Sequence, residues 1–149
     1  MSARSAILVA EDDLNDAFFL ERALAEVDPN VPARFVKTGR ETLDYLQGNP
    51  PFDHRAKNPL PSLLVLDLKM PVVSGFEVLE WVRQDAALHK IPVIVLSGSE
   101  APEDINRAYA LGANIYLAKQ HRAADLSKLI KPVLQKYAVI PIQPCSQIG

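Results

Sequence analysis

Three short runs of consecutive apolar residues limit the possible folds of this chain more than any other feature of its sequence. They cover residues 6–10 (AILVA), 63–66 (LLVL) and 91–96 (IPVIVL), and none of them alternates apolar with polar residues. Continuous apolar runs of this length are typical of strands that are buried on both faces, as in a parallel sheet. Residues 113–118 and, more weakly, residues 33–37 have a similar character, so the sequence predicts five strands.

Amphipathic stretches separate these runs and predict five helices. The first follows Asp13, and either Asp13 or Asn15 is suited to cap its N-terminus. Another has Pro102 in its first turn and ends before Gly112, an asymmetry that helices commonly show. Strands that alternate with helices predict an α/β fold with a doubly wound parallel sheet. The predicted helices cover residues 14–27, 40–46, 76–87, 101–111 and 123–137.

Two segments that contain proline depart from this alternation. Pro132 lies inside the last predicted helix, where a proline costs roughly 3 kcal/mol, so we expect a bend or a helix in two pieces. The connection over residues 48–61 is 14 residues long and contains four prolines, whereas such connections usually take about 2–6 residues. It is either an ordinary surface loop or a loop that contacts a partner.

Length and charge narrow the domain organisation and the class of function. The 149 residues fit one domain, which we place at residues 1–137, followed by a tail at residues 138–149 with no output domain. The net charge of −2 argues against general nucleic-acid binding, because phosphate neutralisation supplies most of that affinity. The longest apolar run has six residues, far fewer than the ~20 of a membrane helix, and no secretory signal is visible. The single cysteine, Cys145, fits a reducing cytoplasm.

Polar and charged residues follow four of the predicted strands at their carboxyl ends. Glu11 and Asp12 follow the first strand, Asp67 the third, Ser97 the fourth and Lys119 the fifth. Ligands of open parallel sheets bind beyond the carboxyl ends of the strands, so we expect these side chains to converge at one edge.

The chemistry of this set is specific. Carboxylates at the ends of adjacent strands repel one another, and Mg²⁺ relieves the repulsion because it prefers oxygen ligands. A lysine and a hydroxyl group stabilise charge on a phosphoryl group, and the carboxylate of Asp67 could attack a phosphorus atom to give an aspartyl phosphate. Each residue alone also has a simpler explanation, such as helix capping for the acids and Ser97, or a solvated charge for Lys119. Together and in this order they favour a phosphoryl-transfer site.

Four motifs lie in register along the chain: residues 7–12 (ILVAED), 64–71 (LVLDLKMP) with Gly75, 95–98 (VLSG) and 116–119 (YLAK). Over roughly residues 5–135 the chain thereby resembles the receiver domain of two-component response regulators. The resemblance implies a flavodoxin-like sheet of five parallel strands in the order 2-1-3-4-5, with five helices. It also implies a signalling protein that takes a phosphoryl group from a histidine kinase, and no enzymatic activity beyond phosphorylation and dephosphorylation of itself.

The resemblance further implies a role for each residue of the motifs, with Mg²⁺ as the cofactor. Asp67 is the implied phospho-acceptor. The implied metal ligands are Glu11, Asp12, Asp67 and the backbone carbonyl of Lys69. The implied phosphoryl-binding residues are Ser97, Gly98 and Lys119, and the implied switch pair is Ser97 and Tyr116. For Tyr116 the alternative is an ordinary half-buried tyrosine of a strand.

One departure from the family pattern follows the lysine. The family usually has proline there, often after a cis peptide, whereas Gln120 follows Lys119 in this chain. A cis bond before a residue other than proline costs ~2.5–4 kcal/mol, so we predict a trans bond, or a strained one.

A narrower resemblance rests on the long loop before Asp67, the residues LKMP after it, and the expected lack of an output domain. These features resemble the small stand-alone regulators that accompany phytochrome-type sensor histidine kinases. The implied partners are a histidine kinase of that type and a second copy of the chain, in the cytoplasm, with no nucleic acid and no membrane.

Three other functions fit the sequence less well. A phosphatase of the haloacid dehalogenase type needs a second acid two residues after its nucleophile, and Lys69 occupies that position. A nucleotide- or flavin-binding domain needs glycines in the first strand-to-helix turn, which residues 11–14 lack. An unphosphorylated adaptor with a receiver-like fold is disfavoured by the complete set of acids, Ser97 and Lys119.

The apolar residues of the tail, Val139, Ile140 and Ile142, have three possible surroundings. The three alternatives are that these side chains pack back on the last helix, that they extend into solvent, and that they contact a second subunit.

Overall fold

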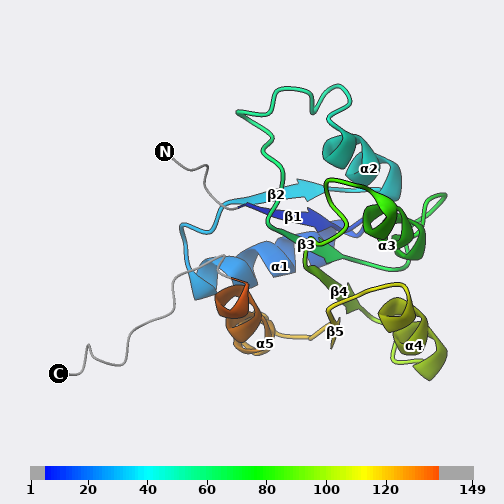
Figure 1. The fold of residues 1–149 in the computed structure, drawn as a ribbon. Coiled ribbons are helices and arrows are strands. Elements are labelled where there is room, and N and C mark those ends of the chain that lie inside the picture. The colour runs from blue at the N-terminus through cyan, green and yellow to red at the C-terminus, as the bar shows by residue number, and fades with distance from the viewer. Residues whose placement is uncertain (1–5, 138–149) are drawn as a thin grey trace.

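Five parallel strands form one sheet in the order β2-β1-β3-β4-β5, and each strand is followed by a helix (Figure 1). The structure is a computed structural model and describes residues 6–137. The strand order and the five helices confirm the predicted flavodoxin-like architecture. The elements are β1 (Ile7–Ala10), α1 (Leu14–Val27), β2 (Ala33–Val36), α2 (Gly39–Gln47), β3 (Leu63–Leu66), α3 (Gly75–Gln84), β4 (Val93–Ser97), α4 (Pro102–Ala110), β5 (Ile115–Ala118) and α5 (Ala123–Lys136).

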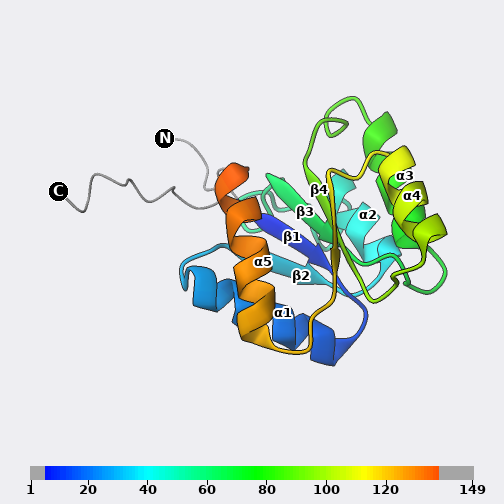
Figure 2. The ribbon, with the colours of Figure 1, turned by 90° about the horizontal axis from the view of Figure 1, so that it is seen from below.

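Helices cover both faces of the sheet, as the unbroken apolar runs predicted. Helices α1 and α5 lie side by side on one face, and α2, α3 and α4 cover the other (Figure 2). Alternate residues of a strand point to opposite faces, so Ile7 and Val9 pack toward α1 and α5, whereas Leu8 packs toward α2 and α3. All four residues of β1 and of β3 are buried, which fixes these two strands at the centre of the molecule.

The boundaries of the elements follow from local capping. Asp13 caps α1 by accepting a hydrogen bond from the backbone N–H of Asp16 over 3.0 Å, which decides between the two predicted caps. The predicted helix over 76–87 is too long, because α3 ends at Gln84. The Asp85 carboxylate accepts the backbone N–H groups of Ala87 and Leu88 over 3.0 and 3.1 Å, and the chain turns there.

Pro132 does not divide the last helix. Helix α5 runs through it from Ala123 to Lys136, so the predicted alternative of a helix in two pieces is wrong. The reason is packing: Leu126, Ile130 and Leu134 are buried on the face that contacts α1. Burial of that apolar face offsets the hydrogen bond that the proline cannot donate.

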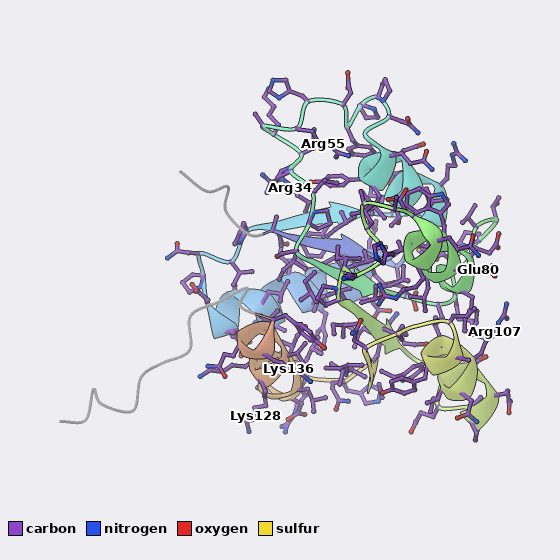
Figure 3. The ribbon with its side chains drawn as sticks, viewed as in Figure 1. Arg34, Arg55, Glu80, Arg107, Lys128 and Lys136 are labelled. Carbon is purple, nitrogen blue, oxygen red and sulfur yellow. The ribbon has the colours of Figure 1, made fainter. Side chains whose placement is uncertain are left out.

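The long connection between α2 and β3 is tied to the domain itself. Arg55 donates to the backbone carbonyls of Tyr45 and Leu46 over 2.8 and 3.0 Å, at the C-terminal end of α2. Tyr45 in turn donates its hydroxyl to the carbonyl of Pro59 over 2.9 Å. At the base of the loop, Arg34 of β2 donates to the carbonyl of Lys57 over 3.2 Å (Figure 3). The loop is therefore packed on its own domain, and contact with a partner stays a prediction.

One sequence prediction concerns residues beyond the described range. The proposed tail at 138–149, with Val139, Ile140, Ile142 and Cys145, lies outside the described residues. Within residues 6–137, no helix has both the length and the apolar character needed to cross a membrane.

Candidate functional site

The carboxyl ends of the two central strands bring three acidic side chains together. Glu11 and Asp12 follow β1, Asp67 follows β3, and these strands are paired in parallel along their whole length. One carboxylate oxygen of each of the three residues lies within 4.8 Å of the other two. Glu11 and Asp67 are each only 5% exposed, whereas Asp12 faces solvent. The sequence predicted this cluster because parallel strands end at the same edge of a sheet.

A glycine allows the segment after Asp67 to fold back closely. The N–H of Gly75, at the start of α3, donates to the carbonyl of Leu68 over 2.9 Å. A Cβ atom at Gly75 would collide with the backbone carbonyl of Asp67, so no other residue fits without a shift of the chain. The loop between β3 and α3 is thereby held directly beneath the acidic cluster.

Lys119 reaches the cluster from the outermost strand on one side of the sheet. It follows β5, which is two strands away from β3, and its side chain is 22% exposed. Its Nζ lies 2.8 Å from Glu11 Oε1, 2.8 Å from Asp16 Oδ2 and 3.6 Å from Asp67 Oδ2. The ammonium group therefore neutralises part of the negative charge of the cluster but leaves a surplus.

Burial raises the pKa values of both buried acids of the cluster. Burial raises the pKa of Glu11 from its ordinary 4.5 to about 7, and the hydrogen bond from Lys119 offsets only part of that effect. Burial also raises the pKa of Asp67, against the attraction of Lys119. For Lys119, burial lowers the pKa, but the hydrogen bonds to Asp16 and Glu11 outweigh it and the net direction is upward. Buried carboxylates whose pKa values are raised mainly by loss of solvent, and further by the charge of a neighbouring carboxylate, are suited to a divalent cation with oxygen ligands.

An open hollow of about 440 Å³ lies over these groups. Ser97, at the end of β4, is fully buried and does not line the hollow itself, and its Oγ accepts a hydrogen bond from the backbone N–H of Ser99 over 3.1 Å. A Cβ atom added to Gly98 would meet nothing within 4 Å, so the space beside Gly98 is free for a ligand. The residues that line the hollow are Glu11, Asp12, Asp13, Asp16, Asp67, Lys69, Gly98, Ser99 and Lys119.

Ser99 connects the hollow to α4 and β5. Its Oγ donates to Asp104 Oδ2 over 2.6 Å, and this hydrogen bond lowers the pKa of Asp104. Asp104 also lies 3.3 Å from Lys69 Nζ. The hydroxyl of Tyr116, which is half-buried, donates to the Ser99 carbonyl over 2.8 Å. Hydrogen bonds through Ser99 thereby link Ser97 with Asp104 and Tyr116.

The structure brings together most of the site that the sequence predicted, and it adds two acids. Asp16 and Asp104 were not singled out, although each lies in the first turn of a helix that starts at this edge. That position was the available signal, but acids in the first turn of a helix are common for reasons of capping alone. The bond between Lys119 and Gln120 is trans, as predicted, because Pro50–Pro51 is the one cis peptide bond of the described residues.

Comparison with known proteins assigns a family model to most of the chain. The model is described as the response regulator receiver domain, and it matches residues 7–131. The response regulator Rcp1 of Synechocystis is 30% identical over 127 residues, which are 85% of this chain and 84% of Rcp1.

Solved structures show the same similarity. The response regulator RPA3017, described in red light signaling of R. palustris, has a TM-score of 0.82 and 37% identity, covering 88% of this chain and 92% of that one. The phosphorylated cyanobacterial phytochrome response regulator RcpA has a TM-score of 0.81 and 30% identity, covering 95% and 99% of the two chains. The Mn²⁺-bound form of Rcp1 has a TM-score of 0.78 and 27% identity, with the same two coverages.

Proposed function

The chain belongs to the response regulator receiver domain family, and from this premise we propose that it accepts a phosphoryl group on Asp67. The observation that carries the proposal is the cluster itself. The carboxylates of Glu11, Asp12 and Asp67 lie within 4.8 Å of one another, and Lys119 reaches them from β5. Glu11 and Asp67 are equally buried and both line the hollow, but Glu11 lies 2.8 Å from Lys119 Nζ, whereas Asp67 lies 3.6 Å from it and has the less engaged carboxylate.

The donor set fits Mg²⁺ as a cofactor. In this proposal the ligands are the carboxylates of Glu11, Asp12 and Asp67 together with the backbone carbonyl of Lys69, all hard oxygen donors. When bound, the ion shields the negative charge of the carboxylates and of the phosphoryl group, so that the two can approach. A similar protein, Rcp1, has been crystallised in a Mn²⁺-bound form, which supports a divalent cation here.

The proposed transfer is an in-line displacement. An oxygen of the Asp67 carboxylate forms a bond to phosphorus while the phosphorus–nitrogen bond of a phosphohistidine breaks, and the departing nitrogen retains its electron pair and takes a proton. Lys119 donates to the phosphoryl oxygens, and the backbone beside Gly98 leaves room for them. Hydrolysis of the acyl phosphate by water returns the carboxylate. The protein therefore phosphorylates and dephosphorylates itself and turns over no other substrate.

The proposed signal is a change of surface. When the hydroxyl of Ser97 turns from the N–H of Ser99 to the phosphoryl group, that N–H loses its acceptor. The Ser99 carbonyl then shifts and the hydrogen bond from Tyr116 breaks, so that the side chain of Tyr116 moves inward. The faces formed by α4, β5 and α5 would present this change to a partner.

The proposed partners follow from the similar proteins. RcpA is described as a phytochrome response regulator and RPA3017 as acting in red light signaling, so we propose a phytochrome-type histidine kinase as the donor. A receiver that acts as a homodimer in the cytoplasm completes the proposal. The chain is similar to Rcp1 and RcpA over most of their length, since it covers 84% of Rcp1 and 99% of the RcpA chain.

The test is phosphorylation with phosphoramidate and Mg²⁺, followed by intact-mass spectrometry. We expect one added phosphoryl group that is lost in base, and no labelling of the Asp67→Asn variant. Asp53→Asn, an exposed aspartate of the 48–61 loop, is the matched control and should be labelled like the wild type. Labelling that survives Asp67→Asn would overturn the assignment, and a wild type that is never labelled would point to an unphosphorylated adaptor.

A further inference from the structure

Asp16 places a fourth carboxylate at the site. It lies in the first turn of α1, and its Oδ2 accepts a hydrogen bond from Lys119 Nζ over 2.8 Å. The two residues are 103 positions apart in the sequence, so their contact is a feature of the folded site and not of a local helix turn. Asp16 lines the same hollow as Asp67.

The ammonium group of Lys119 is divided unequally among its neighbours. It has three N–H donors, and it lies at hydrogen-bond distance, 2.8 Å, from both Glu11 and Asp16. Its distance to Asp67 is 3.6 Å, which is too long for a hydrogen bond between nitrogen and oxygen. Glu11 and Asp16 therefore hold the Lys119 ammonium group too far from Asp67 for a hydrogen bond, although Lys119 is expected to act beside Asp67.

The two carboxylates that hold Lys119 differ in their surroundings. Glu11 is 5% exposed, and without Lys119 this buried acid would keep only the hydrogen bond that its Oε2 accepts from the backbone N–H of Asp13 over 3.1 Å. Asp16 is 43% exposed, so water can replace the lysine when this bond breaks. Of the two contacts, the one with Asp16 is therefore the easier to release.

We propose that Asp16 is a positioning residue that restrains Lys119 in the unphosphorylated protein, so that an incoming phosphoryl group has to compete with Asp16 for contact with the lysine. The inference rests on the proposed role of Asp67. A phosphoryl group carries more negative charge than one carboxylate, and it would approach on the side of Lys119 that faces Asp67. Release of Asp16 then lets the ammonium group move toward the phosphoryl group, while Glu11 keeps its own bond. Asp16 thereby sets the threshold for phosphorylation without contacting the reacting atoms.

The test compares two substitutions that remove the same charge from the same end of α1. Asp16→Asn keeps the size of the side chain but weakens its hold on Lys119. Asp13→Asn is the matched control, since asparagine caps a helix as well as aspartate does and the structure shows no contact between Asp13 and Lys119. Both variants share any general effect of the lost negative charge on the binding of an anionic phosphodonor. Only the additional change in Asp16→Asn therefore reports the restraint of Lys119 by Asp16.

Two readouts decide the proposal, one of them without metal or phosphodonor. In a crystal structure of metal-free Asp16→Asn, we expect Lys119 Nζ to move within hydrogen-bond distance of Asp67. In labelling with phosphoramidate and Mg²⁺, we expect a lower half-saturating donor concentration for Asp16→Asn than for Asp13→Asn, by roughly three- to tenfold, with little change in the maximal rate. This factor corresponds to the free energy of one partly exposed hydrogen bond between charged groups.

Each contrary result has a distinct meaning. Lys119 in its original position, or donor concentrations that are equal in the two variants or higher in Asp16→Asn, would overturn the role of Asp16. A wild type that is not labelled would overturn the proposed function instead, and the metal-free structure would still decide whether Asp16 restrains Lys119.

Discussion

Arg83 and Lys119 are partly buried cations at opposite ends of the strands of the same sheet, which we call its amino edge and its carboxyl edge. The groups that accept their hydrogen bonds differ in charge. Arg83, near the end of α3, lies where β4 and β5 begin. Its guanidinium donates to the backbone carbonyl of Gly112 over 3.0 and 2.7 Å, to that of Ile91 over 2.6 Å and to Asn114 Oδ1 over 2.8 Å. All of these acceptors are neutral. Lys119, where β5 ends, has only carboxylates around it at the site.

The difference separates a structural cluster from a functional one. At the amino edge, the charge of Arg83 is solvated by fixed dipoles and every acceptor gains a donor, so nothing is left for a ligand to satisfy. At the carboxyl edge, one ammonium group faces several carboxylates, and burial raises the pKa of Glu11 to about 7. The first arrangement stabilises the fold, and the second stores electrostatic repulsion that a cation or a phosphoryl group can change.

The largest expected effect on stability comes from the amino edge. We expect Arg83→Met to lower the free energy of unfolding by about 2–3 kcal/mol, because the carbonyls of Gly112 and Ile91 lose their donors. Arg83→Lys should restore less than half of the loss, since one ammonium group cannot reach these acceptors as a planar fork does. Urea unfolding measures both. If phosphorylation per folded molecule falls in Arg83→Met as it does in site variants, the two edges are not separate.

A smaller effect is expected from pH at the carboxyl edge. The folded protein holds the proton of Glu11 up to about pH 7, whereas the unfolded chain releases it near pH 4.5. This contribution to stability is therefore complete below pH 4.5 and is lost as the pH rises through about 7, and the raised pKa of Asp67 acts in the same direction. Metal-free protein should lose on the order of 1–2 kcal/mol between pH 5 and pH 8.

Two variants sharpen this pH prediction. Glu11→Gln should flatten the dependence of the unfolding free energy on pH, because the titrating group is gone. Arg83→Met should be less stable at every pH but keep the slope of the wild type. Equal slopes for the wild type and Glu11→Gln would show that the charge of the cluster does not govern stability.

Much of the fold could be predicted from the sequence, because its strands are buried on both faces and so appear as uninterrupted apolar runs. The prediction erred where a side chain acts on the nearby backbone, as Asp85 does when it ends α3, and where packing outweighs a local rule, as at Pro132. In both cases the deciding contact depends on the folded chain.

The candidate site was predicted for a related reason. Parallel strands end at one edge, so Glu11, Asp67 and Lys119 had to approach one another. Asp16 could not be distinguished because it lies in the first turn of α1, where an acid is common for reasons of capping alone. The cluster around Arg83 could not be predicted at all, since most of its acceptors are backbone carbonyls, which carry no signature in the sequence.

The most direct test of the account is the free energy of unfolding of the wild type and of Asp67→Asn, each measured with and without Mg²⁺. If the carboxyl edge holds surplus negative charge, metal-free Asp67→Asn should be more stable than the wild type by about 1 kcal/mol, because a buried charge has been removed. Mg²⁺ should stabilise the wild type at neutral pH and leave Asp67→Asn nearly unchanged. A metal-free variant that is less stable than the wild type, together with an equal gain from Mg²⁺ in both proteins, would contradict the account.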